Sequence, residues 1–127
     1  MNNASFKIGP FDLAALRKFG ELHGTNGKIH TDPVFADASP TQGIVVQGTL
    51  VMAAIISAAN CLNAHKAPKE TTYDAKFVAM VRLGEVLNLE FSRAEQKSNN
   101  EGEVWDYTCS RENGERVVVG NIIFNNH

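Results

Sequence analysis

The sequence predicts a single α+β domain in which one long apolar helix packs against an antiparallel sheet. Residues 48–65 are apolar on nearly every side, so a helix here must be buried on most of its surface. Residues 71–124 instead alternate apolar and polar side chains between turn signals, which indicates strands. At 127 residues the chain can build one modest core, and no linker or repeat divides it. We therefore expect one domain over residues 1–127.

The chain is expected to begin with a short strand and an amphipathic helix. The strand covers residues 5–8. The helix covers residues 12–22, where leucine or phenylalanine recurs at every third position. Asp12 can cap the first turn of this helix, and Gly24 suits its C-terminal end.

A polar stretch at residues 23–35, HGTNGKIHTDPVF, follows as a predicted loop. Within it, Asp32 and Pro33 form a helix-start signal, because proline is tolerated in a first turn and aspartate can cap one. A short second helix is expected over residues 33–38, ahead of the long helix at about 48–65.

The strands lie mainly in the C-terminal half. A first strand is expected to place one set of apolar side chains on a common face: Tyr73, Ala75, Phe77, Ala79 and Val81. A second run covers residues 86–91, and the polar residues 96–103 connect it to a hairpin. The hairpin pairs residues 104–110 with residues 115–124 across Asn113-Gly114, a strong turn signal. A helix held inside such a curved sheet is the hot-dog arrangement.

Composition excludes several classes of function. The net charge is -2 with no basic cluster, so we expect no nucleic-acid partner. The longest apolar run, residues 50–56, is too short to span a bilayer, and the N-terminus does not resemble a secretion signal. Cys61 and Cys109 lack metal-ligand spacing and are expected to be reduced, buried thiols. We therefore expect a soluble, cytoplasmic protein without a metal ion, a cofactor or a membrane anchor.

Two segments, residues 19–36 (FGELHGTNGKIHTDPVFA) and 43–55 (GIVVQGTLVMAAI), resemble the MaoC-like dehydratase, or (R)-specific enoyl-CoA hydratase, family. Residues 76–87 are similar to the next strand and turn of that family. Several positions match its hydratase signature in register: Gly24, Ile29, His30, Asp32 and, at the start of the long helix, Gly48. The resemblance implies the hot-dog fold and an active site in the loop.

Four positions depart from the family pattern. Thr25 stands where the family has its active-site aspartate. Gly27-Lys28 replaces its Asn-Pro pair, and Gln47 replaces the histidine before the helix glycine. A threonine hydroxyl donates and accepts hydrogen bonds but cannot serve as a base near neutral pH.

The resemblance implies a hydro-lyase that hydrates an enoyl-CoA or dehydrates a 3-hydroxyacyl-CoA. His30 is then the general base and acid, since imidazole can take and return a proton near neutral pH. Thr25 and Asn26 are expected to hold the water. The backbone NH of Gly48, at the positive end of a helix dipole, can hold the thioester oxygen as charge develops on it. Gln47 and Lys28 are the expected substrate contacts, and Asp32 is interpreted as a helix cap.

Two other functions remain open. A non-catalytic hot-dog subunit, or an acyl-CoA-binding partner of a heteromeric hydratase, would not need the missing aspartate. A thioesterase is less favoured, because hot-dog thioesterases generally carry a carboxylate on the central helix and residues 48–65 contain none. In each case we expect a homodimer or a heteromer with a homologous subunit, since a single short sheet leaves its edges open.

Overall fold

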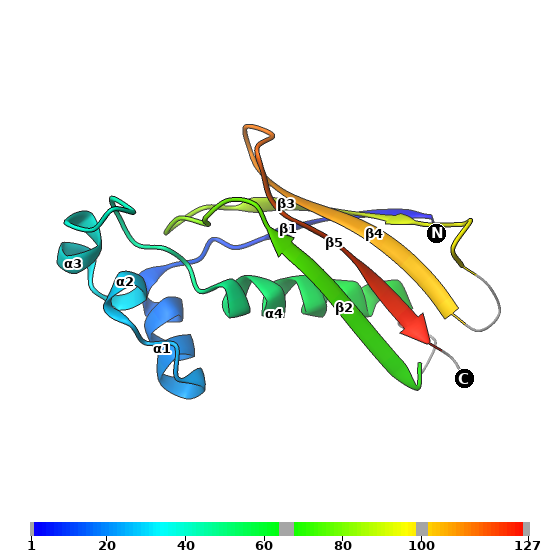
Figure 1. Ribbon diagram of the computed structural model, residues 1–127, viewed down its shortest axis with the longest axis horizontal. Coiled ribbons are helices and arrows are strands. Elements are labelled where there is room, and N and C mark those ends of the chain that lie inside the picture. The colour runs from blue at the N-terminus through cyan, green and yellow to red at the C-terminus, as the bar shows by residue number, and fades with distance from the viewer. Residues whose placement is uncertain (1, 64–67, 99–101, 126–127) are drawn as a thin grey trace.

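A computed structural model of the chain describes residues 2–63, 68–98 and 102–125. The helical elements are α1 (Leu13–His23), α2 (Lys28–Thr31), α3 (Pro33–Asp37), α4 (Gly48–Ala59) and the 3-10 turn η1 (Asn60–Asn63). The strands are β1 (Asn3–Ile8), β2 (Glu70–Phe77), β3 (Leu87–Arg93), β4 (Gly102–Arg111) and β5 (Arg116–Asn125). They form one antiparallel sheet in the order β1-β3-β4-β5-β2. Helix α4 runs along the sheet, and α1 to α3 gather beyond the end where α4 begins (Figure 1).

The core lies between α4 and the inner face of the sheet. Three side chains one turn apart on α4 are fully buried: Val51, Ile55 and Ala59. Alternate side chains are almost as inaccessible on β3 (Leu87, Leu89 and Phe91) and on β4 (Trp105, Tyr107 and Cys109). These two spacings are those of a helix face and a strand face. The hot-dog prediction is confirmed for the helix and the sheet that covers it.

Helix α4 is less covered than its composition predicts. Only the stripe through Val51, Ile55 and Ala59 is buried by this chain, while Ala53 and Ser57 are exposed. The expectation that most of the helix surface is buried is therefore wrong for the single chain, because the sheet covers only one side of it. The helix ends at Ala59 and continues as η1; the predicted end at residue 65 lies outside the described residues.

Most of the predicted helix caps and turns are present. The Asp12 carboxylate accepts the Ala15 NH at 2.8 Å, and Gly24 ends α1 in the left-handed region with φ of 75°. Gly114 takes φ of 91° in the turn between β4 and β5, as the Asn-Gly signal predicts. Residues 23–35 are not all loop, however. The helical turn α2 forms there, with the His30 NH donating to the Gly27 carbonyl at 2.9 Å.

The first predicted strand of the C-terminal half is shorter than expected. It ends at Phe77, whereas the alternating pattern continues to Val81. After Val78 the chain leaves the ladder, and the Val81 carbonyl accepts the Val46 NH at 2.8 Å. A contact between distant parts of the chain therefore ends the strand, and it also fixes the segment that leads into α4.

The two cysteines have different surroundings. Cys109 is buried on β4, and burial raises the pKa of its thiol to about 12. Cys61 is exposed in η1, so the expectation that both thiols are buried is wrong for this residue. It lies just beyond α4, beside Leu62, which is packed against the core. Among the described residues, no helix has the length and hydropathy needed to cross a bilayer.

Candidate functional site

Two contacts join the segment 25–32 to the residues just before α4: His30 contacts Val45, and Gln47 contacts Thr25. They lie at the helical end of the molecule (Figure 1). An extended segment, residues 44–47, links the two. The Val45 NH donates to the Ile29 carbonyl at 3.2 Å, and the Val46 NH donates to the Val81 carbonyl at 2.8 Å. Because residues 44–47 are tied on both sides, they fix α2 relative to the first turn of α4.

His30 is half-buried in α2, and its Nδ1 lies 2.6 Å from the carbonyl oxygen of Val45. A carbonyl oxygen only accepts hydrogen bonds, so Nδ1 carries the proton. In the neutral ring, Nε2 is then unprotonated and has its lone pair available. The contact therefore makes Nε2 the nitrogen that can act as a base, and the group that accepts from Nδ1 lies three residues before Gly48.

Gly48 is the first residue of α4, and no side chain caps the helix at Gln47. The NH groups of Leu50 and Val51 donate to the Gln47 carbonyl. The NH groups before them have no acceptor within the helix, and they lie at the positive end of its dipole. A Cβ on Gly48 would lie 3.4 Å from the ring of Phe77, which is 42% exposed. Such a helix start can hold a developing oxyanion beside an accessible aromatic ring.

Phe77 is a neighbour of this site that the sequence did not reveal. It ends β2, far from Gly48 along the chain, and only the folding of β2 over α4 brings the two together. The alternating pattern continues past Phe77 to Val81, so the sequence carried no signal that singled out this residue.

Gln47 is almost fully buried, with 2% of its surface exposed. Its side-chain Nε2 donates to the carbonyl of Leu16 at 2.8 Å and to the carbonyl of Thr25 at 3.2 Å. Its Oε1 is buried and has no hydrogen-bond partner among the described residues. The side chain therefore joins α1, the loop after it and the start of α4.

Thr25 lies against α1. Its NH donates to the Gly20 carbonyl at 3.1 Å, and a Cβ on Gly20 would lie 2.9 Å from both the Thr25 carbonyl oxygen and the Asn26 Cα. The Thr25 hydroxyl is buried, and within the described part of the chain it has no hydrogen-bond partner. Asn26 is exposed. The two residues expected to hold a water are thus adjacent in sequence but differ in accessibility.

Asp32 and Lys28 have contacts of their own. Asp32 caps α3 by accepting the NH groups of Val34 at 3.1 Å and Phe35 at 3.3 Å, which confirms its interpretation as a cap. Lys28 is exposed, with Nζ 5.8 Å from the centre of the Phe35 ring, a cation–π distance. Arg17, which the sequence did not single out, donates twice to the Thr31 carbonyl and ties α1 to α2.

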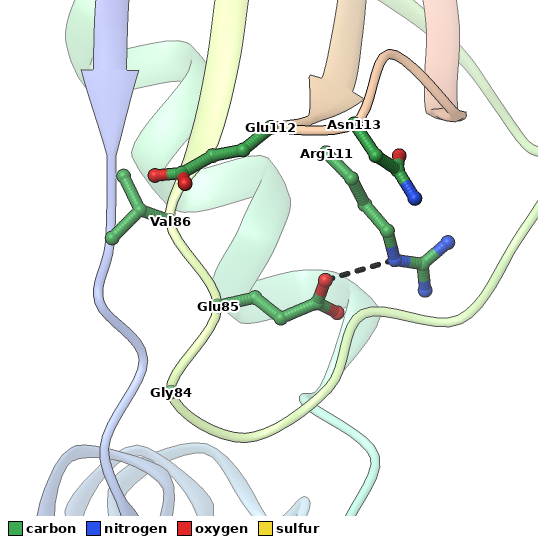
Figure 2. Close-up of a pocket in the computed structure, with 6 residues that line it drawn as sticks. All are labelled: Gly84, Glu85, Val86, Arg111, Glu112 and Asn113. Carbon is green, nitrogen blue, oxygen red and sulfur yellow. Dashed lines mark hydrogen bonds and ion pairs between the residues drawn. The ribbon is translucent and has the colours of Figure 1, made fainter.

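An open cavity of about 310 Å³ lies elsewhere, between residues 84–86 and residues 111–113 (Figure 2). None of the predicted site residues lines it. Arg111 and Glu85 point toward one another there, with Nε 2.8 Å from Oε2. Arg111 also contacts Glu115 and the Met80 carbonyl. These contacts make the pair a tie between β4 and the turn before β3.

The fold is shared with two solved (R)-hydratases and with a complex of two proteins. An (R)-hydratase from A. caviae involved in PHA biosynthesis is 18% identical with a TM-score of 0.79, and the match covers 95% of this chain and 92% of that one. R-hydratase PhaJ1 from Pseudomonas aeruginosa is 21% identical with a TM-score of 0.79, over 97% of this chain and 79% of that one. The ChsH1-ChsH2 complex from Mycobacterium tuberculosis gives a TM-score of 0.82 at 10% identity, over 100% of this chain and 98% of that one.

Comparison at the sequence level gives a family but no individual relative. No curated protein matches the chain. The model of the MaoC like domain matches residues 11–112, which include the loop, α4 and most of the sheet. The chain therefore belongs to the MaoC-like dehydratase family and has its hot-dog fold.

Proposed function

We propose that this protein is an acyl-thioester hydro-lyase, which hydrates an enoyl-CoA or dehydrates a 3-hydroxyacyl-CoA. One observation carries the proposal: the Val45 carbonyl accepts from His30 Nδ1 and leaves Nε2 as the basic nitrogen, three residues before the uncapped start of α4. A base and an oxyanion donor are the two groups that addition of water to a conjugated thioester needs, and here one short segment holds the base and leads into the donor.

In the hydration direction, His30 Nε2 takes a proton from water while the water oxygen bonds to C3 of the enoyl group. The electron pair of the double bond moves toward the thioester, and its oxygen becomes an enolate held by the Gly48 NH. The imidazolium then returns the proton to C2, and the enolate collapses to the 3-hydroxyacyl thioester. Thr25 and Asn26 position the water in this scheme, and Lys28, which is exposed, contacts the substrate.

Thr25→Asp is expected to raise turnover about tenfold or more. A carboxylate here would share the water with His30, and a positioned acid or base contributes on the order of a hundred- to ten-thousand-fold. The measurement is kcat/KM on enoyl-CoA thioesters. Thr25→Asn, which has the shape of aspartate without its basicity, is the matched control. A Thr25→Asp variant that folds and is no faster than Thr25→Asn would contradict this role for position 25.

A non-catalytic subunit is the second candidate, favoured by the absence of a carboxylate at Thr25 and by the buried, unpartnered state of its hydroxyl. A subunit of this kind would bind acyl-CoA or complete a homologous, active partner. It predicts no turnover by the chain alone and turnover only when a partner hydratase subunit is added.

We also propose that a second copy of the chain pairs along β2, one of the two edges of the sheet. The Val78 NH bonds to the Val117 carbonyl at 2.9 Å, in register with the ladder, so even-numbered residues of β2 bond to β5. The backbone groups of the odd-numbered residues then point outward. Antiparallel pairing centred on Tyr73 would place Glu70 opposite Lys76 twice, and two opposite-charge pairs favour that register.

Ala75→Pro tests this pairing, because it removes an outward NH that β5 does not use. We expect the dissociation constant of the dimer to rise about 30-fold or more. Two hydrogen bonds related by symmetry are lost, and each contributes about 1 kcal/mol. Ser5→Pro is the matched control on the other edge, where the Arg93 NH bonds to the Asn2 carbonyl and leaves the Ser5 NH outward. Sedimentation velocity measures the fraction of dimer in the wild type and in both variants. A monomeric wild type would contradict the pairing, and so would an Ala75→Pro variant with the same fraction of dimer as Ser5→Pro.

A further inference from the structure

We propose that Gln47 is a positioning residue, which acts through its side-chain amide to hold the segment with Thr25 and His30 in place against the first turn of α4. This inference rests on the proposed function of the site. Hydrogen–deuterium exchange reports on the structural part without any need for turnover.

The side chain of Gln47 is the one polar or charged side chain in the described ranges that is buried in the core. Both protons of its amide are used, one toward the carbonyl of Leu16 in α1 and one toward the carbonyl of Thr25. Both partners are carbonyl oxygens. A flip of the amide that exchanged Nε2 and Oε1 would therefore place Oε1 against these two oxygens. The orientation of the side chain is therefore fixed.

The two contacts join parts of the chain that are far apart in sequence. Leu16 is 31 residues from Gln47, and Thr25 is 22 residues away. Leu16 is fully buried, so its carbonyl belongs to a rigid part of α1. Gln47 thus fixes the distance between α1, Thr25 and the helix start at Gly48.

The same short segment also holds His30. Val45 accepts from the His30 ring, and two residues later Gln47 donates to the Thr25 carbonyl. Between them, the Val46 NH is bonded to Val81. The spacing of Val45 and Gln47 along residues 44–47 therefore sets the spacing of His30 and Thr25. Loss of the Gln47 amide would release Thr25 while the contact between His30 and Val45 remains.

Packing alone does not explain a glutamine here. The Oε1 of Gln47 is buried without a hydrogen-bond partner among the residues described, and an unsatisfied buried acceptor is costly. Methionine has nearly the same length and would fill the position without that cost. The two donors of the amide are what methionine cannot supply.

Hydrogen–deuterium exchange of residues 25–32 tests the structural part in Gln47→Met and Gln47→Glu. We expect exchange of the Thr25 amide, which donates to the Gly20 carbonyl, to rise about tenfold or more in Gln47→Met, with the sheet unchanged. Gln47→Glu should be at least as disruptive, because carboxylate oxygens would face the two carbonyls. Tyr107→Phe is the control: it also loses a buried hydrogen bond, from the hydroxyl to the Asp74 carbonyl at 2.8 Å, but at the sheet. Unchanged exchange in this segment, or an equal rise in the sheet, would overturn the proposal.

Steady-state kinetics test the catalytic part. Gln47→Met should lower kcat tenfold or more with KM within about threefold, whereas Tyr107→Phe should change neither at equal folded fraction. A substrate contact, the role expected from the sequence, would raise KM instead and would refute positioning. If the wild type turns over none of the thioesters, the proposed function fails, and the exchange result alone decides whether Gln47 holds the loop.

Discussion

His30→Ala is expected to lower kcat/KM on an enoyl-CoA thioester by about a hundred- to ten-thousand-fold, the usual contribution of a general acid–base group. The loss follows from the contact with Val45, which leaves Nε2 as the atom that takes the proton from water. Stability should change little, because the imidazole is only half-buried and makes one hydrogen bond. The measurement is a comparison of initial rates at equal folded concentration.

Two further variants separate chemistry from structure at this position. His30→Asn keeps an NH donor near the place of Nδ1 but supplies no base, so it should be as inactive as His30→Ala. His23→Ala removes an exposed histidine whose ring stacks on Phe19 at 4.4 Å, and it should leave the rate unchanged. Activity that survives in His30→Asn would show that His30 does not move the proton.

Gly120→Ala is expected to give the largest loss of stability, about 3 kcal/mol or more, because the added methyl group has no room. A Cβ at Gly120 would lie 1.9 Å from the Asp74 carbonyl oxygen and 2.8 Å from the Tyr107 hydroxyl. That hydroxyl crosses over the glycine to reach the Asp74 carbonyl on β2. Burial, together with Asp74 and Cys109, raises the pKa of Tyr107 to about 12, so the hydroxyl keeps the proton it donates.

Urea unfolding monitored by Trp105 fluorescence measures this loss. Gly27→Ala is the control, since a Cβ there has no neighbour within 4 Å and its φ of -56° suits alanine. It should change the free energy of unfolding by less than about 1 kcal/mol. Equal stability of Gly120→Ala and the wild type would mean that Tyr107 does not cross over Gly120 as described.

The sequence predicted the parts of this fold whose cause is local. The cap at Asp12, the turn at Gly114 and the apolar helix from Gly48 each follow from a few neighbouring residues. Helix α2 was missed because a four-residue turn has little propensity of its own. It is held by Arg17 on one side and Val45 on the other. The early end of β2 was also missed because its cause is not local: the hydrogen bond between Val46 and Val81 joins segments that are far apart in the sequence.

The candidate site shows the same division. The resemblance predicts that His30 and Gly48 belong to one site. The hydrogen bond between His30 and Val45 gives a physical reason for this, because Val45 lies three residues before Gly48. The contacts of Gln47 with Leu16 and Thr25 could not be predicted. These residues precede Gln47 by 31 and 22 positions, and nothing in the sequence indicates that they meet its amide. The buried state of the Thr25 hydroxyl likewise depends on how closely α1 approaches the loop at Gly20.

A substrate panel tests whether this chain by itself hydrates or dehydrates an acyl thioester. Short, long and bulky enoyl-CoA and 3-hydroxyacyl-CoA thioesters are given to the purified wild type and to His30→Ala, and product is measured by mass spectrometry. We expect interconversion of at least one pair, with a gain or loss of one water, and a loss of at least a hundredfold in His30→Ala. No turnover by the chain alone, with turnover only after a homologous subunit is added, would contradict the proposed function and identify a non-catalytic partner.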